Sequence, residues 1–193
     1  MVGSVGSRRP CVAVFGGSFN PPHVAHQMAC LYALETHPLD QLLVVPCFRH
    51  PFEKQLAPYP DRLAMCRLAM RPLGERVMVS EIEREIGGDV SRTVITLEAL
   101  AAKYPGVDFR LVVGSDLIAE KDKWWRWPDI ERLAPLLVIG RKGYPEKTWP
   151  GPQVELPEIS STEIRSRVAA GQPISSLVPR SVEVFIAEKK LYR

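Results

Sequence analysis

The chain has 193 residues, of which 46% are hydrophobic and 24% charged, and its net charge is +3. This length supports one well-buried core, and the weak, scattered positive charge argues against a protein that coats nucleic acid, while a small anionic substrate is compatible with it. No apolar run approaches the about 20 residues of a membrane span and the N-terminus lacks an apolar signal core, so we expect a cytoplasmic protein without a membrane or nucleic-acid partner.

The N-terminal residues 1–10, "MVGSVGSRRP", are rich in Gly and Ser and then basic. They predict a disordered leader ahead of a single domain over residues 11–193. A chain of this size needs no disulfide staples, and its cysteines lie far apart without a CxxC pair. We therefore expect reduced, mostly buried thiols at Cys11, Cys30, Cys47 and Cys66.

Short β-branched stretches bounded by Gly or Pro predict buried strands at residues 11–15, 41–46, 76–82, 109–114 and 135–140. Apolar residues at three- and four-residue spacing predict helices between them, at residues 22–36, 60–71, 93–103 and 128–133. This alternation predicts an α/β fold with a parallel sheet. A short strand candidate at residues 153–156 precedes two predicted helices, which form a small C-terminal helical part at residues 160–171 and 178–192.

Two proline-rich stretches, residues 46–60 and 143–152, interrupt this rhythm. Ligands of open α/β sheets bind outside the carboxyl ends of the strands, where such loops emerge. We expect active-site loops here, and plain surface connections are the alternative.

The segment "GGSFNPPHVAHQ" follows the first predicted strand and leads into a helix-periodic stretch. Gly16 and Gly17 let the backbone approach a ligand closely. Pro22 suits the first helical position, which places His23 and His26 in the opening turns on one face. The positive N-terminal end of a helix favours phosphates, and histidines beside it can donate hydrogen bonds to them.

Two other roles for these histidines remain open. They can be packed residues with satisfied nitrogens, or they can supply two metal ligands. A metal site lacks a clear third ligand, because His37 and His50 lie in separate proline-flanked segments. The segment matches neither the GxxxxGK[ST] nor the GxGxxG phosphate-binding pattern.

A second phosphate-binding signal lies in "ISSTEIRSR". Ser160 and Glu163 have the spacing of a capping box, which marks a helix N-terminus. Ser161 and Thr162 would present hydroxyl and N–H groups in its first turn, with Arg165 adding a fixed charge. An ordinary capped surface helix is the alternative.

Together these segments resemble the bacterial nicotinate-nucleotide adenylyltransferase family, within the nucleotidylyltransferase superfamily. "GGSFNPPHVAHQ" resembles the family segment GG[ST]FDPxHxGH, and "ISSTEIRSR" resembles ISSTxIR. Between them, "RTVITLEAL" resembles T-[IV]-D-T-L, and "LVVGSD" followed by "WWRW" resembles GxD with a tryptophan-rich turn. The similarity covers nearly the whole chain after residue 10 and implies a Rossmann-like open parallel sheet flanked by helices.

The resemblance implies transfer of AMP from MgATP to nicotinate mononucleotide, giving nicotinate adenine dinucleotide and pyrophosphate in NAD synthesis, with no covalent enzyme intermediate. No resident metal is implied, because Mg²⁺ arrives with ATP. The implied catalytic residues are His23, His26, Lys54 and Arg165. The implied ATP-binding residues are Gly16, Gly17, Ser18, Phe19, Asn20, Gly114, Asp116, Ser160, Ser161 and Thr162. The implied nicotinate-nucleotide-binding residues are Arg92, Thr93, Trp124 and Trp125.

In this assignment Trp124 stacks on the pyridine ring, and backbone N–H groups near Trp124 and Trp125 face its carboxylate. The chain departs from the family pattern at Asn20, Ala25, Arg92 and Ile95. Pantetheine-phosphate adenylyltransferase and a non-catalytic nucleotide-binding module are the alternative functions. Histidines paired with Arg165 argue against a mere sensor, which does not need contacts to a transition state.

Overall fold

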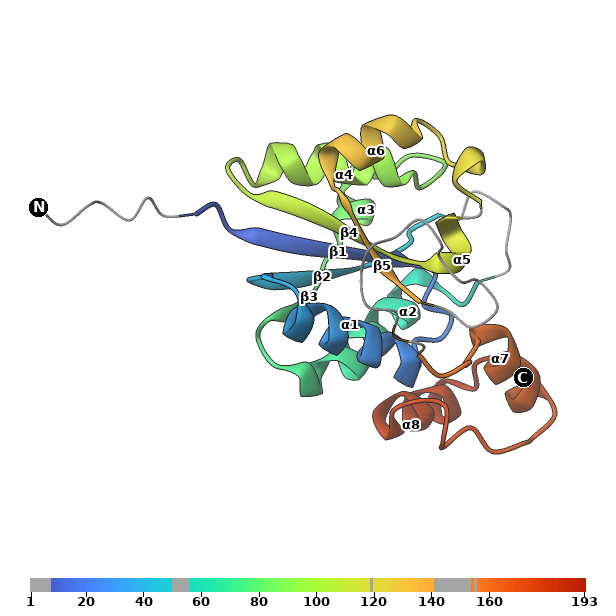
Figure 1. The fold of residues 1–193 in the computed structure, drawn as a ribbon. Coiled ribbons are helices and arrows are strands. Elements are labelled where there is room, and N and C mark those ends of the chain that lie inside the picture. The colour runs from blue at the N-terminus through green and yellow to red at the C-terminus, as the bar shows by residue number, and fades with distance from the viewer. Residues whose placement is uncertain (1–7, 50–55, 119, 141–153, 155) are drawn as a thin grey trace, which may run out of the picture.

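The computed structural model describes residues 8–49, 56–118, 120–140, 154 and 156–193. Its centre is a parallel five-stranded sheet in the order β3-β2-β1-β4-β5 (Figure 1). The strands are β1 (Cys11–Gly17), β2 (Gln41–Pro46), β3 (Val77–Val79), β4 (Asp108–Gly114) and β5 (Leu136–Ile139). All five predicted strands and their parallel arrangement are thus confirmed, with shifted ends.

The third strand is shorter than predicted, because the chain turns after Val79. The Ser80 hydroxyl accepts a 3.2 Å hydrogen bond from the Ile82 N–H, and Ile82 begins a short helix rather than ending the strand. The helices are α1 (Val24–Thr36), α2 (Tyr59–Met70), α3 (Ile82–Ile86), α4 (Thr93–Lys103), α5 (Ser115–Ile118), α6 (Trp127–Leu133), α7 (Ser161–Ala169) and α8 (Arg180–Lys189). The predicted helices, including the C-terminal pair, are all present.

Two hydrophobic cores lie on opposite faces of the sheet. Ala13 faces the core that α1, α2, α7 and α8 cover, whereas its neighbours Val12 and Val14 face the core under α3, α4 and α6 (Figure 1). This alternation follows from the two-residue period of a strand, and both faces are apolar because helices cover both. Because both faces are covered, a ligand site can form at the carboxyl ends of the strands.

The strand order reverses between β1 and β4. The strands β2 and β3 extend the sheet on one side of β1, whereas β4 and β5 extend it on the other. In open α/β sheets such a switch point forms the ligand crevice at the carboxyl ends of the strands. Gly17 ends β1 and Gly114 ends β4, so the two predicted ATP-contacting glycine segments meet there.

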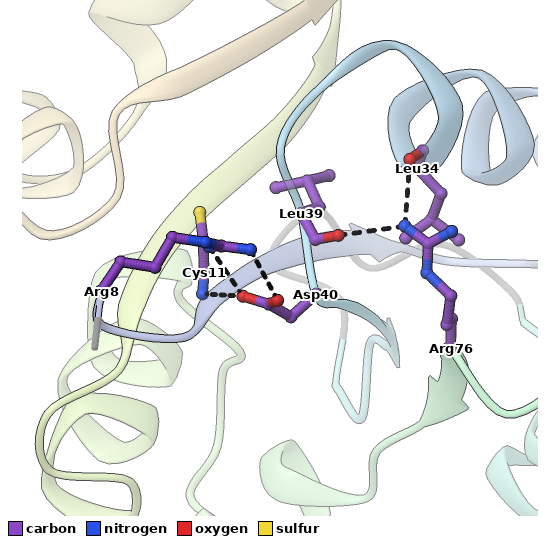
Figure 2. A network of polar contacts seen from close by, with 6 residues as sticks. All are labelled: Arg8, Cys11, Leu34, Leu39, Asp40 and Arg76. Atoms are coloured by element: carbon purple, nitrogen blue, oxygen red, sulfur yellow. Dashed lines mark hydrogen bonds and ion pairs between the residues drawn. The ribbon is translucent and has the colours of Figure 1, made fainter. Parts of the chain in front are cut away.

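A polar network fixes the opposite, amino-terminal end of the sheet (Figure 2). Asp40 binds the Arg8 guanidinium through hydrogen bonds of 2.8 and 3.0 Å and accepts a 2.7 Å bond from the Cys11 N–H. The Cys11 bond and then Arg8 hold the pKa of Asp40 below its usual range. Arg76 donates to the carbonyls of Leu34 and Leu39, at 3.1 and 3.0 Å, and so holds the end of α1 beside β2.

Some expectations concern residues that the structure does not describe. Residues 1–7 of the leader lie outside the described residues, as do Lys54, residues 141–153 and residue 155, so that two of the four residues of the strand candidate at 153–156 are not described. The expectation for the cysteines is confirmed: all four are free thiols, and three are buried. No helix among the described residues is long and apolar enough to cross a membrane.

Candidate active site

The end of β1 and the loop that follows it differ in how much room surrounds their backbone. Gly16 is exposed, and a Cβ built on it meets no atom within 4 Å. Gly17 has no such room, because a Cβ there would lie 3.2 Å from the Phe19 ring. Phe19 is 2% exposed and has a left-handed φ of 45°, and its ring packs edge-on against Phe15. The buried Phe19 side chain therefore anchors the loop to the core, whereas the backbone at Gly16 is exposed to solvent.

Helix α1 begins later than the sequence predicts. Pro22 was expected at the first helical position, but His23 is still extended, with φ −141° and ψ 174°, and acts as the N-cap. The helix proper starts at Val24, so His23 precedes it and His26 lies in its first turn.

The two histidines are held face to face. Their ring centroids lie 3.6 Å apart at an interplanar angle of 25°. The His26 Nδ1 accepts a 3.1 Å hydrogen bond from the His23 N–H. An accepting Nδ1 carries no proton, so the proton of a neutral His26 ring lies on Nε2. His26 thus has a donor on the far side of its ring from the helix cap, as a phosphate contact requires.

The second predicted phosphate segment docks directly on this loop. Ser160 caps α7 as predicted, since its Oγ accepts from the Glu163 N–H at 3.1 Å. The Ser161 hydroxyl donates to the Pro21 carbonyl at 2.9 Å. Pro21 and Ser161 are 140 residues apart in the sequence. The N-terminus of α7 and the loop before α1 are therefore one structural unit.

Arg165 joins the same two segments. Its Nη1 donates to the Asn20 carbonyl at 2.9 Å, and its Nη2 donates to the Thr162 hydroxyl at 3.2 Å. These two bonds fix the orientation of the guanidinium between the loop before α1 and the Thr162 hydroxyl of α7. A fixed arginine next to two helix N-termini is an arrangement that stabilises phosphate oxygens.

Arg62 is a further residue of this region that the sequence patterns did not single out. It is 1% exposed, and it donates to the Ser18 carbonyl at 2.8 Å and to the Ala57 carbonyl at 3.0 Å. Burial lowers its pKa, and no carboxylate forms an ion pair with it within the described part of the chain. The sequence does hold a signal for the burial of Arg62. Its four- and seven-residue spacing from Cys66 and Ala69 places it on the buried face of α2.

The end of β4 supplies the other half of the crevice. A Cβ at Gly114 would collide with Oδ1 of Asp116, so a larger residue there would force this carboxylate to turn away from the backbone of β4. Asp116 lies in the first turn of α5, after Ser115, and is not the N-cap. Its position at the carboxyl end of β4 suits an acceptor for a ribose hydroxyl.

The predicted nicotinate-nucleotide residues form a cluster at the start of α4 and before α6. Trp125 is 49% exposed, with the guanidinium carbons of Arg92 and Arg126 at 5.0 and 5.3 Å from its ring centroid. Thr93 is the first residue of α4, next to Arg92. Trp124 packs edge-on against Trp127, with centroids 5.6 Å apart.

One detail of this cluster differs from expectation. The Trp124 N–H donates a 2.9 Å bond to the Lys121 carbonyl, because residues 121–123 form a 3₁₀ turn that ends at this amide. This amide is engaged in the present conformation, so the expected donation to a nicotinate carboxylate requires the turn to open. The departing residues Ala25 and Ile95 pack inward, Ala25 as a buried residue and Ile95 against the core under α4.

Across the ranges that the structure describes, no group of three or more His, Cys, Asp or Glu side chains is placed to hold a metal ion. The His26 ring packs against Phe15 and Phe19, at centroid distances of 5.8 and 4.9 Å.

Comparison with known proteins gives the same picture. Residues 14–167 match the family model described as cytidylyltransferase-like. A probable nicotinate-nucleotide adenylyltransferase of Anaeromyxobacter dehalogenans (strain 2CP-C) is 50% identical over 184 residues, which cover 94% of this chain and 96% of that protein. The chain belongs to the nicotinate-nucleotide adenylyltransferase family. A second member of this adenylyltransferase family, from Myxococcus xanthus, is 39% identical over 181 residues, 94% of each chain.

The fold of this adenylyltransferase-family chain also has solved counterparts. The Plasmodium falciparum nicotinic acid mononucleotide adenylyltransferase complexed with NaAD superposes with a TM-score of 0.80 over 95% of this chain and 97% of that one, at 20% identity. This likeness confirms the expected Rossmann-like fold.

Proposed function

We propose that the protein transfers AMP from MgATP to nicotinate mononucleotide and releases pyrophosphate. The observation that carries the proposal is the junction of the two phosphate segments, through the bonds from Ser161 to Pro21 and from Arg165 to Asn20. The junction brings the N-terminus of α7 and Arg165 onto the segment that leads from the exposed Gly16 to the two histidines at the start of α1. The family relationship supports both substrates.

The reaction is a single in-line displacement. A phosphate oxygen of nicotinate mononucleotide attacks the α-phosphorus of ATP, the bond from that phosphorus to the bridging oxygen breaks, and pyrophosphate leaves with the electron pair. Nothing covalent forms on the protein, so its residues position the substrates and stabilise charge. Mg²⁺ enters with ATP and offsets charge on its phosphates.

The phosphate-side residues divide this work. The His26 Nε2–H and His23 contact the ATP phosphates, and the backbone from Gly16 cradles the reacting groups. Ser160, Ser161, Thr162 and Arg165 hold the triphosphate from α7, and Lys54 adds charge. Asp116 accepts from a ribose hydroxyl beside Gly114.

The acceptor end uses the aromatic cluster. Trp124 stacks on the pyridine ring, and Thr93 with Arg92 faces the carboxylate. Two features support this placement: the Arg92 guanidinium lies over the Trp125 ring, and Arg92 is the N-cap of α4, directly before Thr93. Charge from Arg92 favours nicotinate over nicotinamide.

Labelling tests the proposed bond exchange. With ATP labelled at the α-phosphate, the label should appear in a dinucleotide that forms only when nicotinate mononucleotide is present. With ATP labelled at the γ-phosphate, the label should appear in pyrophosphate. Release of single phosphate, with no labelled dinucleotide, would overturn the proposal.

A further inference from the structure

The last residues of the chain fold back on the loop before α1. Helix α8 is closed by bonds from the Lys190 and Leu191 N–H groups to the carbonyls of Ala187 and Ile186, at 3.2 and 3.1 Å. Lys190 and Tyr192 both take left-handed conformations, with φ of 53° and 64°. Such conformations are uncommon outside glycine, so this turn is held by its contacts. It places the C-terminus beside α7 (Figure 1).

Tyr192 uses this turn to reach Asn20. Its hydroxyl donates a 2.9 Å hydrogen bond to the Asn20 Oδ1, across 172 residues of sequence. Burial raises the pKa of Tyr192, more than the nearby Arg165 and Arg62 lower it. The hydroxyl therefore keeps its proton at neutral pH and can donate to Asn20.

Asn20 is the point where several parts of the chain are tied together. Its side chain is 2% exposed, and its Oδ1 accepts a second bond, from the Ala57 N–H at 3.0 Å. Its carbonyl accepts from Arg165 at 2.9 Å. Arg62 continues the network by binding both the Ala57 and Ser18 carbonyls. A buried acceptor that loses a donor is destabilised in that conformation, so each bond restricts where Asn20 can lie.

We infer that Tyr192 is a positioning residue, which holds Asn20 and through it the backbone between Gly16 and His23 in the geometry that contacts phosphate. The inference rests on the proposed function. It assigns to the penultimate residue of the chain a part in adenylyl transfer, although that residue touches no substrate. It also explains why Asn suffices at position 20, where the family segment has Asp: its single side-chain oxygen accepts from both donors.

The first test is Tyr192→Phe, which keeps the packed ring and removes only the hydroxyl. We expect kcat to fall about 2- to 15-fold, the effect of one neutral hydrogen bond. The KM for nicotinate mononucleotide should stay within about twofold, because the acceptor ring binds at the tryptophan cluster. The matched control is Tyr104→Phe, at an exposed tyrosine that ends α4, which should leave both values unchanged.

The second test asks whether Tyr192 acts through Asn20. In an Asn20→Ala background, Tyr192→Phe should add no further loss of kcat, since the acceptor is already gone. Fully multiplicative losses would overturn the inference, because they would mean that the two residues act independently.

Amide hydrogen exchange tests the same inference without a measurement of catalysis. In Tyr192→Phe, amides between Ser18 and His26 should exchange faster than in the wild type or in Tyr104→Phe, while the strands of the sheet, including β1 up to Gly17, keep their protection. Unchanged exchange in this segment would overturn the inference. An inactive wild type would instead overturn the proposed function, and the exchange result would still decide the role of Tyr192.

Discussion

The Arg165 guanidinium donates a 2.9 Å hydrogen bond to the carbonyl oxygen of Asn20, 145 residues earlier in the chain. This one bond joins the helix that follows the last strand to the loop that follows the first. Because Nη2 also holds the Thr162 hydroxyl, the guanidinium is fixed at two of its nitrogens, and its plane is set before any substrate binds. Fixed donors stabilise developing charge without reorganisation, which is the main contribution that a phosphoryl-transfer enzyme can make.

Arg165→Lys tests this geometry while keeping the charge. A lysine cannot span Asn20 and Thr162 in a fixed fork, so kcat/KM should fall about 10- to 150-fold, the range for hydrogen bonds to charged groups. Steady-state kinetics with ATP as the varied substrate measures the effect. Arg167→Lys is the matched control, because Arg167 lies on the same helix and pairs with Glu163. Equal effects of the two substitutions would contradict the assigned role.

His26→Ala removes the proposed phosphate donor. We expect kcat to fall about 100-fold or more, as for loss of a transition-state charge contact, with the fold intact by circular dichroism. His37→Ala is the control, since His37 caps the other end of α1 and contacts Thr36. A near-wild-type kcat for His26→Ala would show that the stacked histidine pair is only structural.

The choice of acceptor should depend on Arg92. Nicotinate and nicotinamide differ by a carboxylate against an amide, so Arg92→Ala should lower the kcat/KM ratio of the two mononucleotides by about 2- to 5-fold, the effect of an exposed charge pair. Trp124→Ala should lower kcat/KM for both acceptors, because stacking does not depend on the substituent. A wild type with equal kcat/KM for the two acceptors would refute the selectivity.

The sequence patterns predicted the sheet well because each strand is β-branched, short and bounded by Gly or Pro. They also found Ser160 as an N-cap, since capping depends on neighbouring residues. They misplaced the start of α1, where Pro22 looked helical but the chain stays extended through His23. The contacts of Asn20 with Arg165 and Tyr192 could not be predicted, because they join residues more than 140 positions apart by tertiary packing.

The network at Asp40 gives a prediction about stability. Its pKa is lowered in the folded protein, so the carboxylate contributes stability above the pKa of an unfolded aspartate, about 4, and loses it as the pH falls through the folded value. Asp40→Asn should therefore unfold at lower denaturant than the wild type at pH 7, and the difference should shrink below about pH 4. Urea unfolding at several pH values measures it. A difference that grows on acidification would contradict the assignment.

Pyrophosphate release across a panel of acceptors is the sharpest test of adenylyl transfer to nicotinate mononucleotide. With saturating MgATP, we expect rapid release with nicotinate mononucleotide, slower release with nicotinamide mononucleotide, and none with phosphopantetheine or without an acceptor. Release that is equally fast with phosphopantetheine, or absent with every acceptor, would contradict adenylyl transfer to nicotinate mononucleotide.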